Sequence, residues 1–393
     1  MMCIGARAQN WQPTGLTNSY YDRAAMSADG SKQFITSYLT YSYYLSTNYG
    51  EIWTSNSEPQ VSLESASQSA YVTMAASADG SIVVAAGVTN WLYVSTNSGV
   101  SFYSNAVPDV AAWGAVASSA EGSKLYAAAG SSSWPPGAIY SSTNLGVSWN
   151  LTGSPTNVWV GMAASADGNK LVAVSGGAYQ GVICTSTNGG TAWSQVPGSS
   201  NYWTSVASSA DGTHLAAVTF KDAYPVPGHV YTSVDSGLTW KSNNVPTDYF
   251  ESVAISADGK RLLAAGSSGF SPVHTYFSTD FGVTWSSNNV PPNGFSVGVA
   301  MSADGGILVA APLGDRPYEA RSIVSPVLHV NPAGPNTVLG WIVPSTNFIL
   351  QQSADLVTWA AVTNVPVLNC TNLQEQVAVT ATNGAAFYRL TTP

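Results

Sequence analysis

Short apolar stretches alternate with polar turn residues along most of the chain. One representative unit contains Gly161-Met-Ala-Ala-Ser165, Leu171-Val-Ala-Val174, Gly181-Val-Ile-Cys-Thr-Ser186 and Ala192-Trp-Ser-Gln-Val196, separated by turns or a variable loop. The turns contain Asp-Gly and Asn-Gly steps, which favour tight turns because Gly accepts positive φ and Asn or Asp bonds its own backbone. The pattern therefore predicts a unit of four short β-strands.

The tetrapeptide Ser-Ala-Asp-Gly marks the repeat of this unit. Its acidic position occurs seven times, at spacings of 50, 42, 46, 44, 47 and 46 residues, as Asp29, Asp79, Glu121, Asp167, Asp211, Asp258 and Asp304. A strand-rich unit with a period in the forties is typical of propeller blades. We therefore predict an all-β fold with a seven-bladed β-propeller.

The two ends of the repeat region complement each other. Trp11 lies 18 residues before Asp29, the spacing at which a fourth-strand tryptophan precedes the repeat acid in later units. The last unit, from about 296 to 324, has only three strand patterns. We expect the N-terminal strand to complete this blade and close the ring, so that the propeller spans 9–325 and leaves no open sheet edge.

The two chain ends differ from the repeats. Residues 326–393 contain short alternating strands with Pro, Asn and Gly breaks, which predict a small β-sandwich. This part resembles C-terminal modules of secreted bacterial proteins. Residues 1–8 end in Ala6-Arg7-Ala8, similar to the end of a signal peptide, but the apolar stretch that should precede it is missing. A misplaced start codon and a chance match both remain open.

A second motif, Ser-x-Asn/Asp-x-Gly-x-x-Trp/Phe, ends most units. Its six copies span 46–53, 95–102, 142–149, 186–193, 233–240 and 278–285. The motif resembles the Asp-box, or BNR repeat, of the sialidase-like propellers. The resemblance implies a hairpin whose polar residue bonds the turn backbone and whose aromatic packs between sheets, on the face opposite the active site.

The composition argues against several classes of partner and location. A net charge of −9 with only 12 Lys and Arg gives no basic face, so we expect no nucleic-acid partner. No run of 18 apolar residues predicts a membrane span. The low charge fits a secreted or cell-surface protein, which we expect to be a monomer. The three cysteines have no metal spacing, and no cofactor motif occurs.

Aromatic residues mark the face opposite these turns. One set stands eight residues before the repeat acid and includes Trp113, Trp159 and Trp203. A second set lies in the loops between second and third strands and consists of Tyr41, Trp91, Trp134, Tyr179, Tyr224, Phe270 and Tyr318. Both sets are candidate ligand contacts, because aromatics stack on sugars or bury a partner's apolar groups. The alternative is packing between blades.

Charged residues gather in one sector of this face. Asp22 and Glu251 replace small or uncharged residues of the other units, and Arg23 and Arg316 lie on nearby segments. Two carboxylates across a cleft could act as acid and base in glycoside hydrolysis. Ordinary solvated loop charge is the alternative. His229 and His274 occupy similar places before their third strands, where either a shared site or isolated strand-end histidines would fit.

The family resemblance is compatible with both a hydrolase and a binding protein. Asp-box xyloglucan hydrolases use two Asp residues but carry two propellers, and the Phe/Tyr-Arg-Ile-Pro motif of sialidases is absent from this sequence. The propeller-type photosystem assembly factors imply protein docking. We expect a secreted, non-catalytic binding propeller that recognises a glycan or an extracellular protein through the aromatic face. The alternative is a polysaccharide-cleaving hydrolase or lyase that uses Asp22 and Glu251.

Overall fold

The structure is a computed structural model that describes residues 10–17, 21–37, 43–56, 73–87, 91–107, 112–130, 136–176, 180–223, 226–267, 273–290, 295–333, 336–344, 348–380 and 386–392. These residues form strands, bridges and turns, and no helix occurs among them. The predicted all-β fold is therefore confirmed. In the same residues, no helix is long and apolar enough to cross a membrane.

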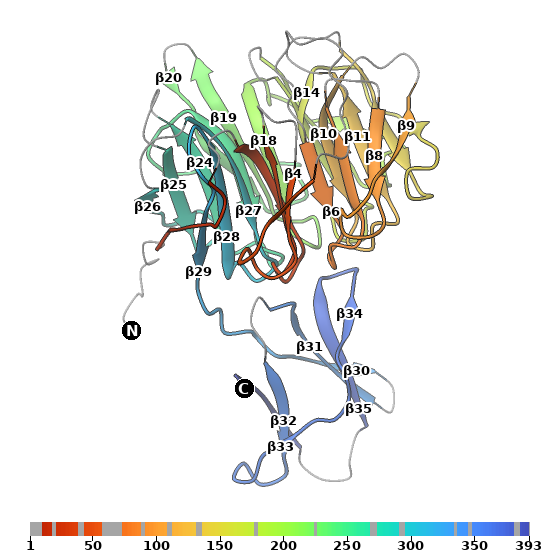
Figure 1. The fold of residues 1–393 in the computed structure, drawn as a ribbon, viewed down its shortest axis with the longest axis vertical. Helices are drawn as coiled ribbons and strands as arrows, with labels where there is room; N and C mark the ends of the chain where they lie inside the picture. Colours follow the sequence, from red (N-terminus) through yellow and green to blue (C-terminus); the bar gives the residue numbers. More distant parts are fainter. Residues whose placement is uncertain are drawn as a thin grey trace.

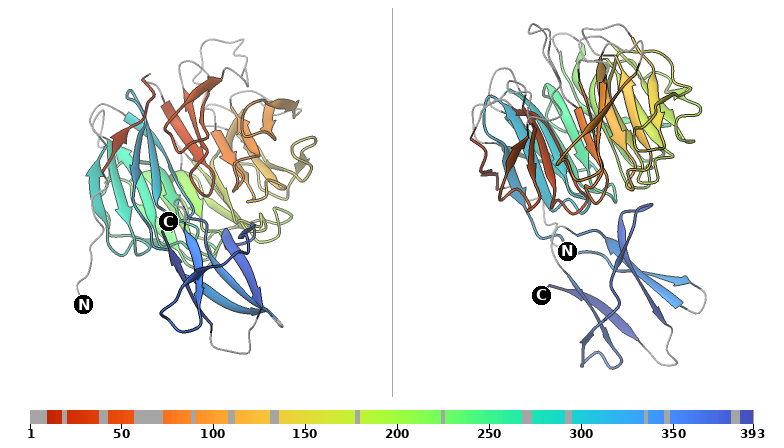
Figure 2. Two further views of the ribbon diagram at one scale, coloured as in Figure 1. Left: turned by 60° about the horizontal axis from the view of Figure 1, so that its bottom comes forward. Right: turned by 45° about the vertical axis from the view of Figure 1, so that its right-hand side comes forward.

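Antiparallel sheets of mostly four strands stand round a common axis (Figure 1, Figure 2). We name each sheet by its first strand. The first three sheets hold β2 (Tyr21–Met26), β3 (Gln33–Ser37), β4 (Tyr43–Ser46) and β5 (Thr54–Asn56); β6 (Thr73–Ala76), β7 (Val83–Ala86), β8 (Trp91–Ser95) and β9 (Tyr103–Ala106); β10 (Trp113–Ser118), β11 (Leu125–Ala129), β12 (Ile139–Ser142) and β13 (Asn150–Leu151).

The chain continues round the axis in the same way. The next sheets hold β14 (Trp159–Ala164), β15 (Leu171–Ser175), β16 (Ile183–Ser186) and β17 (Ser194–Gln195); β18 (Tyr202–Ser208), β19 (Leu215–Ala223), β21 (Val230–Ser233) and β22 (Lys241–Ser242), with β20 (Val226–Pro227) paired to β19; β23 (Phe250–Ile255), β24 (Leu262–Ser267), β25 (Val273–Ser278) and β26 (Ser286–Asn289); and β27 (Phe295–Met301), β28 (Ile307–Leu313) and β29 (Tyr318–Arg321).

The fourth strand of the β27 sheet comes from the beginning of the chain. Strand β1 (Gln12–Pro13) pairs antiparallel with β29, opposite Glu319 and Tyr318. Beside it, Trp11 is 6% exposed and belongs to the apolar cluster of this sheet and the β23 sheet. Its indole Nε1 donates to Thr275 Oγ1 at 3.2 Å. The N-terminal residues are thus part of the propeller core.

The Ser-Ala-Asp-Gly turns meet at one end of the axis. The alanine N–H of each turn donates to the alanine carbonyl of the next sheet, at 2.7–3.0 Å. The N–H of Ala303 donates to Ala28 O, so the chain of bonds returns to its start. We call this set the alanine ring: Ala28, Ala78, Ala120, Ala166, Ala210, Ala257 and Ala303.

Each Ser-Ala-Asp-Gly turn is held by its own side chains, as the β14 sheet illustrates. Ser165 Oγ donates to Asp167 Oδ1 at 2.5 Å and accepts from Lys170 N at 3.0 Å, while Asp167 Oδ1 also accepts from Asn169 N at 2.9 Å. Burial alone would raise the pKa of Asp167. The hydrogen bonds from Ser165 and Asn169, together with the charge of Lys124, hold this pKa below its usual value.

The Ser-x-Asn/Asp turns between the third and fourth strands are built similarly. Ser233 Oγ donates to Asp235 Oδ1 at 2.7 Å and accepts from Gly237 N at 2.9 Å. Asp235 Oδ1 accepts from Thr239 N at 2.9 Å. Gly237 adopts φ 87°, a left-handed conformation that favours glycine. The repeated polar residues of both motifs are therefore used inside their own turns.

The C-terminal module, β30 to β36, forms two small sheets below the propeller in Figure 1. One sheet has the order β30 (His329–Ala333), β31 (Asn336–Ile342), β35 (Gln374–Thr380) and β34 (Val367–Asn369); the other has the order β33 (Ala360–Ala361), β32 (Ile349–Ser353) and β36 (Phe387–Thr391). Both sheets contribute to one apolar cluster of Leu339, Trp341, Leu350, Val377 and Val379. This module therefore has a core of its own.

The Ser165→Ala change tests the turn chemistry. We expect it to lower the free energy of unfolding by about 1–2 kcal/mol at pH 7, because Asp167 and Lys170 N each lose a buried partner. The pKa of Asp167 is lower in the folded chain, so its stabilisation is complete above the unfolded pKa near ~4 and is lost as the pH falls through the folded pKa. The difference from the wild type should therefore shrink below about pH 4 in urea titrations.

The matched control is Ser148→Ala. Ser148 is exposed in a Ser-x-Asn turn, and its hydroxyl accepts one bond from Asn144 Nδ2 at 2.9 Å. This change should alter the stability by less than about 0.5 kcal/mol. Equal losses in both variants would contradict the role given to Ser165.

Candidate functional site

The predicted loop aromatics divide into three groups. Five of them lie outside the described residues: Tyr41, Trp134, Tyr179, Tyr224 and Phe270. Trp91 opens β8 and is 39% exposed, so a ligand can reach its ring. Tyr318 is 6% exposed and packs in the cluster that contains Trp11, with its hydroxyl donating to Asp315 Oδ2 at 2.9 Å. The predicted ligand role of Tyr318 stays a prediction, and its enclosed ring favours the alternative of packing.

The inner aromatic set is also buried. Trp113, Trp159 and Trp203 are 2%, 0% and 3% exposed and belong to the apolar clusters between neighbouring sheets. Trp203 packs edge-on against Tyr231 with ring centroids 5.1 Å apart. The predicted ligand role of these three tryptophans stays a prediction, and their burial favours the alternative of packing between blades. They fill the space between sheets, which was the alternative for a set repeated at one position.

The two predicted catalytic carboxylates occupy equivalent backbone positions. The strand register shifts around Asp22 in β2 and around Glu251 in β23, and such β-bulges re-aim a side chain. Glu251 Oε2 accepts a hydrogen bond from Val297 N, in the next sheet, at 3.1 Å. The side chain of Asp22 lies outside the described residues. Their joint catalytic role stays a prediction.

The two predicted arginines lie in different sheets. Arg23 is half-buried in β2, directly after the bulge. Arg316 is exposed in the connection between β28 and β29, where its N–H donates to Asp315 Oδ1 at 2.7 Å. Arg316 is therefore available to an anionic group on a ligand.

A repeated Asn or Asp precedes the innermost strand of three consecutive sheets. The side-chain Oδ1 of Asn157, Asn201 and Asp248 accepts from the following backbone N–H at 3.0, 2.8 and 2.8 Å. The backbone of each also bridges a glycine before the third strand, as Asp248 does with Gly228. The three residues therefore have the same structural task, but only Asp248 brings a carboxylate to it.

Asp248 gathers two further donors from β25. His274 Nδ1 lies 2.8 Å from Asp248 Oδ2, and the hydroxyl of Tyr276 donates to the same oxygen at 3.0 Å. The Asp248 side chain is 1% exposed, whereas that of His274 is 24% exposed. Burial, followed by the charge of Asp248, raises the pKa of Tyr276, so this phenol remains a donor. The buried carboxylate thus orients a partly exposed imidazole.

An aromatic pair adjoins this cluster. Tyr249 follows Asp248 in the chain, and its ring lies 5.0 Å from that of Phe220, measured between centroids, at an interplanar angle of 44°. Phe220, in β19, is 38% exposed. Together with the Asp248, His274 and Tyr276 side chains, these rings form what we call the aromatic–imidazole patch. It lies at the opposite ends of the strands from the alanine ring, because β23 runs from Phe250 next to this patch towards Ala257.

Only some residues of the aromatic–imidazole patch could be selected from the sequence. Asp248 is one of the few charged residues of the chain and lies on the face opposite the repeated turns. His274 and His229 form a pair of similarly placed histidines. Phe220 and Tyr249 stand outside both repeated aromatic positions. A search for aromatics next to each Asn/Asp cap would have selected Tyr249. Among the described residues, no cluster of three or more His, Cys, Asp or Glu side chains could hold a metal ion.

Asp248→Ala and Asp248→Asn should separate the contribution of the Asp248 charge to stability from that of its hydrogen bonds. We expect the alanine change to lower the free energy of unfolding by about 1–3 kcal/mol, because Tyr276, His274 and a backbone N–H lose their acceptor. The asparagine change should cost clearly less, since Asn201 caps the same position and its Nδ2 donates to the hydroxyl of Tyr231 at 3.3 Å. Guanidinium unfolding measures both, and equal losses would show that the charge itself stabilises the sheet.

Comparisons with known proteins agree with this geometry. The family described as the DUF6242 beta propeller domain matches residues 66–305, more than half of the chain. No curated protein sequence matches it. The propeller prediction is thus confirmed by the family match and by the sheets of the structure.

Solved structures share the fold at low sequence identity. YCF48 bound to D1 peptide has 15% identity and a TM-score of 0.57, with 81% of this chain and 96% of that chain covered. The GH74 xyloglucanase from Xanthomonas campestris has 12% identity and a TM-score of 0.60, with 85% and 59% covered. Hydrazine synthase from Kuenenia stuttgartiensis has 18% identity and a TM-score of 0.57, with 80% and 98% covered. Such identities show a common fold, and the family match shows that the chain belongs to the DUF6242 β-propeller family.

Proposed function

We propose that this chain is a non-catalytic binding propeller that recognises a glycan or a protein partner through the face opposite the alanine ring. The observation that carries the proposal is the aromatic–imidazole patch, where Asp248 orients the His274 imidazole and the next residue, Tyr249, forms a tilted ring pair with Phe220. An exposed aromatic pair supplies flat apolar area, and a fixed imidazole supplies a directional hydrogen bond. Sugar rings and peptide side chains both need this combination.

The distribution of polar groups supports binding on this face. The acids of the Ser-Ala-Asp-Gly turns and the Asn or Asp residues of the Ser-x-Asn/Asp turns are used by their own backbones, as Asp167 and Asp235 are. The aromatic–imidazole patch departs from the repeat and leaves an imidazole edge partly exposed. In repeat proteins, such departures on a shared scaffold are where ligands bind.

The solved structures are compatible with either ligand class. One carries a D1 peptide, and another is a xyloglucanase. Since a propeller hosts unrelated functions on one frame, their ligands are only candidates for this chain. We propose a polysaccharide or an extracellular protein, and neither a nucleic acid nor a cofactor.

The finer architecture belongs to the same proposal. We propose a seven-bladed ring over 9–325, closed by β1, with Asp-box hairpins and a C-terminal β-sandwich over 326–393. The return of the alanine ring from Ala303 to Ala28 and the pairing of β1 with β29 support it. We further propose a secreted or cell-surface monomer, which the low charged fraction of 8% favours.

A polysaccharide-cleaving activity is the second candidate. Asp22 and Glu251 favour it, because they place carboxylates at a bulge that the β10, β14 and β18 sheets also have but fill with uncharged residues. Against it, Glu251 Oε2 already accepts a bond from Val297 N. Cleavage of a bound polysaccharide that is lost in Asp22→Asn and Glu251→Gln would establish this activity.

Phe220→Ala tests the aromatic–imidazole patch. Affinity electrophoresis through gels that carry plant, algal or bacterial polysaccharides should retard the wild type in at least one gel. The variant should bind at least about tenfold more weakly, because the more exposed ring of the aromatic pair is removed. Trp91→Ala tests the exposed tryptophan at the start of β8 in the same gels.

Val147→Ala is the matched control. Val147 is 65% exposed in a Ser-x-Asn turn, at the alanine-ring end of the strands, and its truncation should leave the retardation unchanged. Retardation that persists in both aromatic variants would overturn the glycan site. Free migration of the wild type in every gel would direct the search to protein partners.

A further inference from the structure

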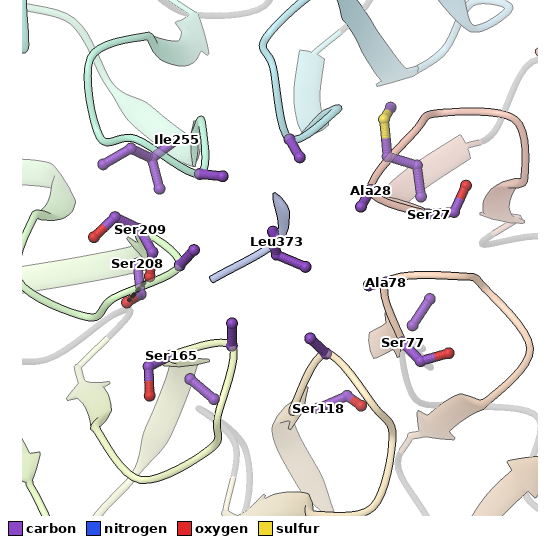
Figure 3. A pocket seen from close by; sticks show the side chains of 18 of the residues that line it. Ser27, Ala28, Ser77, Ala78, Ser118, Ser165, Ser208, Ser209, Ile255 and Leu373 are labelled. Atoms are coloured by element: carbon purple, nitrogen blue, oxygen red, sulfur yellow. Dashed lines mark hydrogen bonds between the residues drawn. The ribbon is translucent and has the colours of Figure 1, made fainter. Parts of the chain in front are cut away.

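The alanine ring surrounds a cavity of about 170 Å³ (Figure 3). Above the ring, Met26, Ile255 and Met301 line the wall from three neighbouring sheets. The hydroxyls of Ser118 and Ser208 also lie there, and each donates to the carbonyl of the following residue, at 2.8 and 3.0 Å. The polar side chains of this wall are thus already satisfied, and the surface suits an apolar occupant.

One side chain of the C-terminal module occupies the mouth of this cavity. Figure 3 shows Leu373 at the centre of the ring of turns, and the residue lines the cavity. It stands in the tight turn between β34 and β35 with φ 53°, and its carbonyl accepts from Val343 N at 3.0 Å. Val343 and Leu368 pack with it in the same apolar cluster as the ring alanines.

We propose that the alanine ring is a docking socket and that the C-terminal module binds it through an apolar cluster whose central side chain, the plug, is Leu373. The kind of partner that fits is an aliphatic residue at the tip of a tight β-hairpin. In this chain the module supplies that residue itself. The module then closes this cavity.

The chemistry of the ring accounts for an apolar plug. The N–H and the carbonyl of each ring alanine form hydrogen bonds with the alanines of the two neighbouring sheets. What remains facing the axis is a circle of methyl groups, which offers contact area and few hydrogen bonds. A branched aliphatic side chain gains from that contact and leaves no polar group unpaired.

The charges round the socket work against docking. Burial and then the carboxylates of Glu121 and Asp79 raise the pKa of the Cys370 thiol. Burial raises the pKa of Glu375 as well, and the nearby Asp29 adds to the effect. The Glu375 carboxylate of the module therefore lies near the Asp29 carboxylate of the propeller, while the Cys370 thiol stays neutral. The attraction must come from the apolar contact at the centre, which makes Leu373 the sensitive position.

Leu373→Gly isolates the plug from its turn. Glycine accepts the positive φ at this position, so the hairpin keeps its backbone while the side chain is lost. We expect Cys370, in the full chain with Cys3→Ser, to react with iodoacetamide at least threefold faster. Release exposes the thiol and removes the causes that raise its pKa. The buried Cys184 is the internal reference, and X-ray scattering should show a larger radius of gyration.

Leu356→Gly is the matched control. Leu356 is also a leucine at positive φ, 63°, in a turn of the module, but it is 56% exposed. This variant should react like the wild type. Leu373→Asp places a charge in the socket and should release the module more fully than the glycine variant. Wild-type Cys370 reactivity and wild-type scattering in both Leu373 variants would overturn the proposal, and so would equal effects of Leu356→Gly and Leu373→Gly.

Discussion

The backbone hydrogen bonds of the alanine ring are the constraint on which the propeller depends. Each sheet contributes one N–H and one carbonyl at the closest approach to the axis, and the bonds run round the ring at 2.7–3.0 Å. Neighbouring backbones can come this close only if the residue there is small. Alanine meets this requirement without the loss of conformational entropy that glycine would bring. The repeated Ser-Ala-Asp-Gly sequence is therefore a condition of the ring.

Other contacts between sheets follow from this approach. The Lys124 ammonium donates to Asp167 O at 2.9 Å, and Lys32 reaches Asp79 O in the same way at 2.7 Å. Each lysine thus binds the turn of the next sheet, whose carboxylate is occupied by its own serine. The polar side chains at the alanine-ring end of the strands are consequently used to hold the turns and neighbouring sheets together. The other end carries the aromatic–imidazole patch and the exposed Trp91.

The repeat made the architecture predictable, because one pattern occurs many times and errors in a single unit average out. The same repetition made the aromatic residues ambiguous, because a regular spacing does not distinguish a ring that packs between sheets from a ring that is exposed. Trp159 is enclosed and Trp91 is exposed, yet both recur at fixed positions. Burial depends on the neighbouring sheet, which the local sequence does not describe.

Contacts between residues that do not recur in the repeat could not be predicted from the sequence, for a related reason. Asp248 and His274 are 26 residues apart and meet because β25 runs beside the cap of β23. Leu373 belongs to a turn that no repeat contains, and its partners are spread over the whole propeller. No spacing rule relates one leucine to seven alanines.

The caps at Asn157, Asn201 and Asp248 separate two tasks within one side chain. Oδ1 holds the backbone in all three, so the remaining atom can be an amide nitrogen or a carboxylate oxygen without altering the turn. An exchange between Asn and Asp thus adds or removes one negative charge on this face and keeps the hydrogen bond that holds the backbone. Such a frame can acquire new specificities sheet by sheet, which makes these positions natural starting points for engineering.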